Sequence, residues 1–229
     1  MEERKLMKLG RSSLVISLPK NWIDLNNLKQ GDKLSVEVQG DHSLSVYPSI
    51  KEKKKEKNIT LHIDVNEDQN SISRSIIACY LNGYSSIRLV SRKIFTTPQQ
   101  RAIRHVARIL FLRIMESDSK NIQMKTLVDE SRTSILSNLD RMHMIAVSMC
   151  RDALNALFEL DKALAKTVYS LDDDVDQFCF FILRILRTVS NDPALLKKLN
   201  LEPIDCQDYQ VLTYRIEHVA DHAASIAKN

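Results

Sequence analysis

The sequence predicts an α+β protein of several domains, and three changes of pattern along the chain support this. Up to residue 48, short runs alternate apolar and polar residues, which is typical of β-strands. Residues 58–125 alternate strand-like and helix-like segments, and residues 126–229 carry only the spacing of amphipathic helices. We therefore expect a β domain at 1–50, a charged linker at 51–57, a small α/β domain at 58–125 and a three-helix bundle at 126–229.

Composition excludes several classes of protein. The 229-residue chain has no run of about 18 consecutive apolar residues, so no transmembrane helix and no membrane insertion are expected. The N-terminus lacks an apolar signal core, which favours a cytoplasmic protein. The four cysteines are far apart and form no CxxC pair, so they are expected to be reduced and mostly in the core: Cys79, Cys150, Cys179 and Cys206.

Charge is unevenly distributed along the chain. Residues 1–57 carry 12 Lys and Arg against 8 Asp and Glu, and residues 58–125 carry 10 against 5. Residues 126–229 reverse this balance, with 11 against 16. A basic front and an acidic back favour a polyanionic partner for the first part and a cation for the last part.

The first 25 residues predict a basic turn, a strand and a helix start. Gly10 permits a sharp bend with Arg11 at its tip, and Leu14–Leu18 is an apolar strand candidate. Pro19 suits the start of a short helix at Lys20–Leu25. Basic side chains therefore bracket one strand: Lys8, Arg11 and Lys20.

Two further strands are expected at residues 34–38 and 44–48, separated by a turn at Gly40-Asp41. A segment of about 50 residues with no disulfide or metal motif rarely buries enough apolar surface to fold alone. We therefore expect the N-terminal domain to form a homodimer that shares strands between two chains.

Residues 5–48 resemble the SpoVT-AbrB, or swapped-hairpin, DNA-binding domain. The resemblance is carried by the motifs Lys8-Leu9-Gly10-Arg11-Ser12-Ser13, Leu18-Pro19-Lys20-Asn21-Trp22, Gly31-Asp32 and Leu44-Ser45-Val46-Tyr47-Pro48. It implies an obligate dimeric swapped-hairpin β-barrel whose basic surface contacts duplex DNA. The residues it assigns to DNA are Lys8, Arg11, Ser12, Ser13, Lys20 and Asn21. The competing interpretation is that Arg11 and Lys20 are merely solvated charges.

The middle segment predicts a βαβα unit. Strands are expected at 59–63 and 87–90, with a helix at 71–82 between them that ends at Gly83. Thr97-Pro98-Gln99-Gln100 predicts a capping box that opens a helix to Met115, and residues 122–127 form either a third strand or the approach to the next helix. A basic stripe on the second helix is either solvated or touches DNA or phosphate: Arg101, Arg104 and Arg108.

The last segment predicts three amphipathic helices, at about 129–160, 162–189 and 206–229, with a short helical turn at Asp192-Pro193. Short connections between them favour an up-down-up bundle. Two acidic pairs lie on the second and third of these helices, Asp172 with Asp176 and Glu217 with Asp221. The members of each pair are four apart and share a helix face.

Like charges at that spacing repel each other, and a bound metal cation would offset this repulsion. Carboxylate oxygens suit Mg²⁺, Mn²⁺, Fe or Zn²⁺. The competing interpretation is a solvated acidic face. His218 and His222 lie on the same helix and could complete a site, although histidines that cap or fill structure are commoner.

Residues 126–229 are similar to the PhoU family of phosphate-uptake regulators. The motifs Leu171-Asp172-Asp173-Asp174-Val175-Asp176 and Arg215-Ile216-Glu217-His218-Val219-Ala220-Asp221-His222 resemble that family's paired acidic metal motifs. The order of segments resembles archaeal phosphate uptake regulators. The family usually has two three-helix repeats and this chain has room for one, so either a repeat is missing or a second copy completes the pair.

The function expected from these features is a DNA-binding transcriptional regulator of phosphate uptake and phosphate homeostasis, with PhoU-like negative regulation and metal binding. The alternative is an adaptor that acts on a phosphate transporter or sensor kinase without binding DNA. An enzyme is not expected, because no nucleophile and base pair accompanies the four carboxylates.

Overall fold

The computed structural model describes residues 3–38, 42–48, 57–128 and 133–229. These residues belong to two compact units, Met1–Lys55 and Glu56–Asn229. Almost all of the expected linker at 51–57 lies outside the described residues, as do the turn at Gly40-Asp41 and the expected helix start at Asp129.

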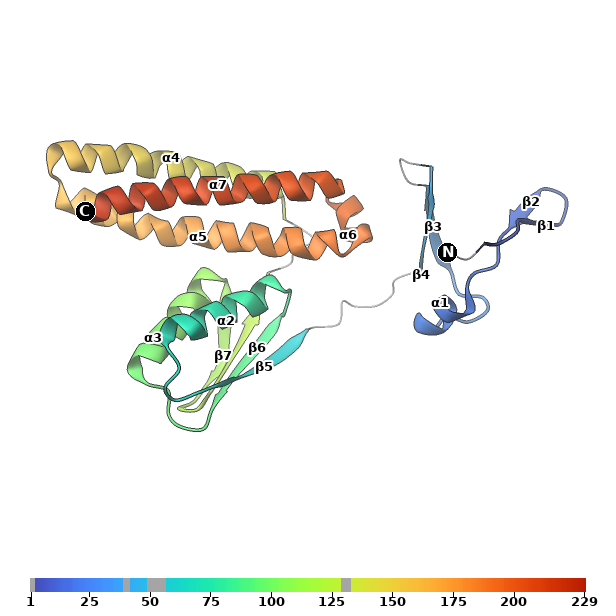
Figure 1. Ribbon diagram of the computed structural model, residues 1–229, viewed down its shortest axis with the longest axis horizontal. Helices are drawn as coiled ribbons and strands as arrows, with labels where there is room; N and C mark the ends of the chain where they lie inside the picture. The colour runs from blue at the N-terminus through green and yellow to red at the C-terminus, as the bar shows by residue number, and fades with distance from the viewer. Residues whose placement is uncertain (1–2, 39–41, 49–56, 129–132) are drawn as a thin grey trace. The chain divides into compact units, whose positions relative to one another are not determined.

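The first unit consists of two antiparallel hairpins joined by a short helix (Figure 1). Strand β1, Met7–Leu9, pairs with β2, Ser13–Val15, and helix α1, Lys20–Leu25, follows. Strands β3, Leu34–Val38, and β4, Leu44–Pro48, form the second hairpin. The predicted bounds of helix α1 are confirmed. The strand expected at residues 14–18 ends at Val15 instead, because β1 offers only three residues for pairing.

This unit has no core of its own in the described residues. No side chain whose burial is described there is buried, and large apolar side chains stand open to solvent. Leu25 is 81% exposed, although such a side chain normally helps to form a core. The other large apolar side chains exposed in this unit are Leu6, Met7, Leu9, Leu14, Ile16, Val36, Val38 and Leu44.

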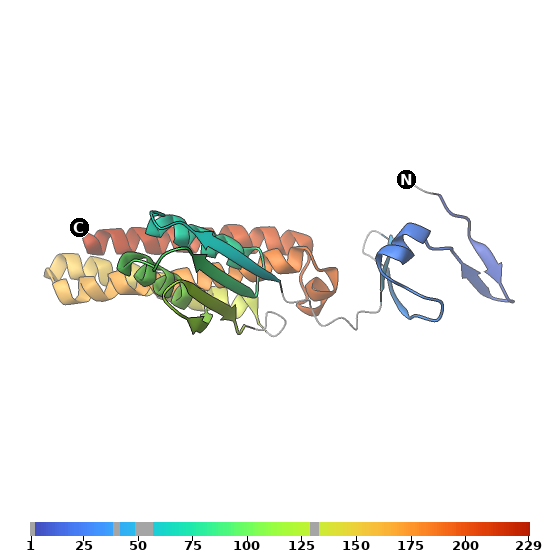
Figure 2. The same cartoon turned by 90° about the horizontal axis from the view of Figure 1, so that it is seen from below.

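The second unit begins with a mixed four-stranded sheet in the order β5-β6-β8-β7. Strands β5, Asn58–Ile63, and β6, Ser86–Ser91, are parallel. Strand β8, Asn121–Thr126, is antiparallel to β6 and to β7, Leu112–Ser117. Helices α2, Gln69–Leu81, and α3, Thr97–Ile109, cover the sheet face turned toward the bundle (Figures 1 and 2).

The prediction for residues 97–115 was wrong at its C-terminal end. Helix α3 ends at Ile109, and the chain then reverses through Phe111, whose φ is +52°. Of the remaining residues predicted to be helical, Leu110 and Phe111 form the turn, and Leu112 to Met115 belong to β7. A left-handed φ usually requires glycine, so a phenylalanine there gives no sequence signal for a helix end. The capping box is present one residue earlier than expected, between Thr96 and Gln99.

Three long helices form the rest of the unit: α4, Ile135–Glu159, α5, Lys162–Ser190, and α7, Pro203–Lys228. The short helix α6, Pro193–Lys198, begins at the predicted Asp192-Pro193 turn, where Asp192 accepts a hydrogen bond from the N–H of Leu195. The three helices run up, down and up around one apolar core, as predicted. None of the helices in the described part of the chain combines the length and apolarity needed to cross a membrane.

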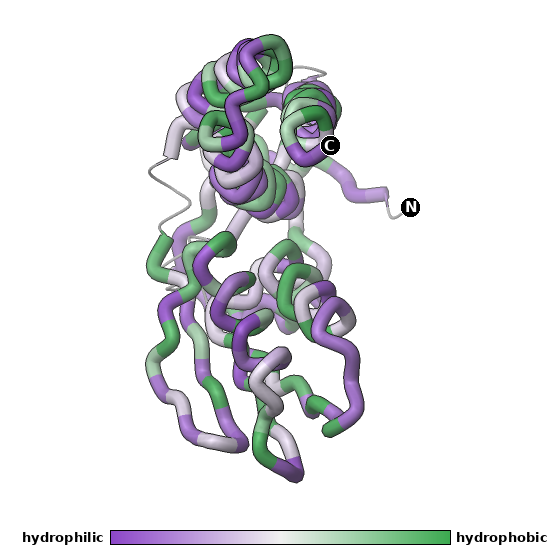
Figure 3. Tube along the Cα trace, turned by 90° about the vertical axis from the view of Figure 1, so that its left-hand side faces the viewer, coloured by the Kyte–Doolittle hydropathy of each residue, from purple (hydrophilic) through white to green (hydrophobic). Residues whose placement is uncertain are grey.

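Helix α5 joins the bundle to the α/β part of the unit, because it packs against both α2 and α3. Helices α4 and α7 lie on the far side of α5 from those two helices (Figure 3). The described residues of this unit contain two apolar cores, one between sheet and helices and one inside the bundle. Cys79, Cys179 and Cys206 are buried as free thiols, and Cys150 is partly buried.

Candidate functional site

Four of the predicted DNA-binding residues lie together on the first hairpin. Lys8 pairs with Leu14 across the ladder, and Ser13 pairs with Leu9 next to the turn. Gly10 has φ +69°, which a residue with a side chain rarely adopts, so glycine makes the tight reversal possible. Arg11 and Ser12 therefore project from the tip of a hairpin that no other described element of the unit covers, and both are exposed.

Lys20 and Asn21 lie elsewhere in the unit, in the first turn of α1. Both side chains are exposed. The N-terminal end of a helix carries unpaired N–H groups and favours anions, although α1 is only six residues long. All six predicted residues are thus accessible to solvent, on two separate elements.

The predicted acidic residues come together between α5 and α7. Burial, followed by repulsion from Asp172, Glu217 and Asp221, raises the pKa of Asp176 to about 7. Burial and the charge of Asp221 also raise the pKa of Asp172 and of Glu217. The mutual effects show that carboxylates from the two helices face one another across a partly desolvated boundary. The i, i+4 spacing predicted that each pair shares one face of its own helix, and the fold adds the proximity of the two pairs.

These carboxylates do not form a ready-made metal site. Their oxygens are the ligand type that hard cations prefer. In the part of the chain that the structure describes, however, no three His, Cys, Asp or Glu side chains are placed to hold one metal ion together. The His218 Nε2 lies 3.5 Å from the Glu217 Oε2, so that histidine contacts the acidic cluster at its edge. A bound cation would have to draw the side chains closer together.

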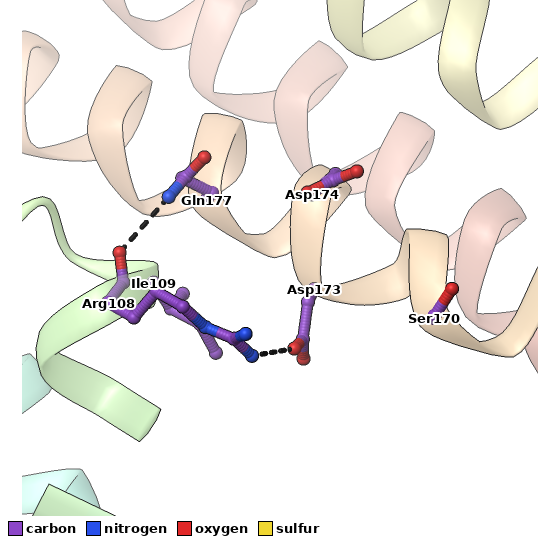
Figure 4. A pocket seen from close by; sticks show the side chains of 6 residues that line it. All are labelled: Arg108, Ile109, Ser170, Asp173, Asp174 and Gln177. Atoms are coloured by element: carbon purple, nitrogen blue, oxygen red, sulfur yellow. Dashed lines mark hydrogen bonds and ion pairs between the residues drawn. The ribbon is translucent and has the colours of Figure 1, made fainter. Parts of the chain in front are cut away.

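Asp173, beside the cluster, is bound to helix α3 (Figure 4). Its Oδ2 accepts a hydrogen bond of 2.6 Å from the Arg108 guanidinium, and its Oδ1 lies 3.6 Å from the His105 Nε2. The Gln177 amide donates to the Arg108 carbonyl at 3.0 Å. A cavity of about 260 Å³ lies here, lined by Arg108, Ile109, Ser170, Asp173, Asp174 and Gln177. Arg108, the last residue of the predicted basic stripe, therefore links two elements of the second unit.

Sequence reasoning missed Arg184, which is only 2% exposed on α5. Its guanidinium donates hydrogen bonds to the carbonyls of Tyr80 and Tyr84, at the C-terminal end of α2, and lies 4.6 Å from the Tyr80 ring centroid. A cation beside the last turn of α2 and the residues that follow it adds a donor to these carbonyls and complements the helix dipole. The available signal was an arginine inside the apolar run of residues 178–186.

Comparison with protein families matches two separate segments of the chain. Residues 139–229 match the family described as PhoU domain, and this segment includes all four predicted acidic residues. Residues 7–56 match the family described as antidote-toxin recognition MazE, bacterial antitoxin. The chain therefore combines a MazE/AbrB-type domain with a PhoU domain. Comparison with curated proteins and with solved structures gives no significant match.

Proposed function

We propose that this protein is a DNA-binding transcriptional regulator of phosphate uptake and phosphate homeostasis that acts in the cytoplasm. The observation that carries the proposal is the exposed hairpin tip with Lys8 and Arg11, which lies within the MazE-type match. The PhoU domain on the same chain supplies the link to phosphate. Both matched domain types are regulatory, and we propose no catalytic activity.

The DNA-binding form is a homodimer through the N-terminal unit. Exposed apolar side chains in a unit with no buried residue among those described support this, because a second copy would cover them. A twofold dimer displays two copies of the basic tip. Lysine and arginine at such a tip contact DNA phosphates and position the protein on the duplex.

The test is a fluorescence-anisotropy titration of full-length protein with duplex DNA at several salt concentrations. Each phosphate contact contributes about 0.9 to the slope of log K against log salt concentration. Arg11→Ala should weaken binding and reduce that slope by about 2, because a dimer loses two contacts. Lys33→Ala is the matched control, an exposed lysine of the same unit outside the hairpin tip.

Equal loss in both variants would mean that net charge, and not the hairpin tip, carries the interaction. No binding of any duplex would overturn the regulator proposal. It would favour an adaptor that contacts a phosphate transporter or sensor protein directly.

We further propose that the acidic cluster binds a divalent or iron-type cation through Asp172, Asp176, Glu217 and Asp221. The raised pKa values support this, because a cation would offset the repulsion that they report. Such an ion would join α5 to α7. Elemental analysis and Mn²⁺ titration by calorimetry would test it on wild type and on an Asp176→Asn/Asp221→Asn variant. Equal metal content in the two proteins would refute the site.

A further inference from the structure

The outward side of α4 carries a stripe of apolar side chains that the bundle core does not use. The core side of this helix is buried, whereas the stripe residues are between 43% and 78% exposed. They are Leu136, Met144, Val147, Leu154 and Phe158. With Asp140 and Arg151 they recur every three or four residues, which is the spacing of a helix–helix contact seam.

Helix α7 carries a second exposed stripe: Ile204, Val211, Leu212, Val219 and Ile226. Figure 3, which looks along the bundle, shows hydrophobic residues on the sides of α4 and α7 that are turned away from α5 and the α/β part. We call the two stripes together the α4/α7 face. Monomeric proteins rarely expose this many large apolar side chains on one side of a helical bundle, which is typical of an interaction site.

We propose that the α4/α7 face binds the same face of a second copy of this chain, with the two α4 helices packed antiparallel about a twofold axis. The charges within the α4 stripe select this partner. Asp140 lies four residues before Met144, and Arg151 lies four residues after Val147. An antiparallel copy centred between Met144 and Val147 therefore places Asp140 opposite Arg151, twice, around an apolar centre. A parallel copy would place like charges opposite each other.

The size of the face also suits a stable dimer. A standard interface buries about 800 Å² on each partner, and ten large apolar side chains that are each roughly half exposed supply most of that area. An apolar centre with charged residues at its edge is the usual composition of such a contact. This contact lies in the second unit and does not depend on the hairpin dimer, so either can exist without the other.

Cross-linking tests the contact in full-length protein. Val147→Cys is introduced in a Cys150→Ser background, since Cys150 is the native thiol that is only partly buried. A short bismaleimide should then join two copies through residue 147, which lies close to the proposed axis. Arg141→Cys is the matched control, because this exposed residue lies about 120° away around the same helix.

The charge pair supplies the decisive comparison. Asp140→Arg should weaken the cross-link roughly tenfold, because two attractions become repulsions. Adding Arg151→Asp should restore it, and circular dichroism should show unchanged helix content throughout. Equal cross-linking at residues 141 and 147, or no response to Asp140→Arg, would overturn the proposal. Absence of any cross-link at residue 147 would also overturn it and leave the face to a different protein.

Discussion

The partly buried carboxyl group of Asp176 should make the metal-free protein more stable in mild acid than at neutral pH. Its pKa is raised from 3.8 to about 7 in the folded chain. Between these two values the folded state holds a proton that the unfolded state has lost, so the free energy of unfolding falls as pH rises through this window. The loss is nearly complete about one pH unit above the folded-state pKa.

The size of the effect follows from the shift. Each unit of pKa difference corresponds to about 1.4 kcal/mol, so a fully expressed shift of about three units amounts to roughly 4 kcal/mol. Because Asp176 keeps some contact with solvent, we expect about half of this, on the order of 2 kcal/mol. Asp176→Asn removes the charge and keeps the shape, so it should stabilise the protein by about that amount at pH 8 and by little at pH 4.5.

Urea unfolding with a chelator present, followed by far-ultraviolet circular dichroism at both pH values, measures this difference. Asp174→Asn is the matched control: Asp174 is exposed on the same helix, and its substitution should change stability by less than about 0.5 kcal/mol. If Asp176→Asn destabilised the protein at pH 8, or acted equally at both pH values, the acids of α5 and α7 could not be repelling one another as described.

Two further substitutions test the contacts between the helical bundle and the α/β part of the second unit. Arg184→Met should lower the free energy of unfolding by about 2–4 kcal/mol in urea titrations, because carbonyls at the end of α2 lose a buried donor. The exposed Arg187, changed to methionine, should have little effect. Arg108→Ala removes the surface bridge to Asp173 and should cost less than about 1 kcal/mol, with the difference disappearing in 1 M salt. A large salt-independent loss would show that this bridge is more than a surface contact.

Much of the fold follows from local sequence pattern. The helix at Lys20–Leu25 and the three long helices have periodic apolar residues, and the structure places most of their ends within a few residues of the expected bounds. The exception is the start of α4, which was expected at about residue 129 and lies at Ile135, where Ser134 caps the helix. The parallel pair β5 and β6 follows from two apolar runs with a helix between them. These features are recoverable because the residues that determine each element lie inside it.

The missed features depend on partners far away in the chain. The sequence of β7 is compatible with a continued helix, and its strand conformation depends on pairing with β8. The chain reversal at Phe111 uses a left-handed φ that the sequence does not predict for phenylalanine. The role of Arg184 depends on the end of α2, about a hundred residues earlier. The acidic cluster was predictable in part: the spacing gave each pair on one helix, but only the fold brings Asp176 near Glu217.

Both units expose large apolar side chains, but among the described residues only the second unit also has buried cores, so the two units should respond differently to dilution. The second unit has two cores of its own, so its exposed α4/α7 face can stay open while the unit remains folded. The first unit has no buried side chain among those described, so the homodimer that we propose would supply the apolar contacts that this unit lacks. Dilution should therefore separate the proposed α4/α7 contact without loss of circular dichroism, whereas separation of the proposed hairpin dimer should unfold its β-strands.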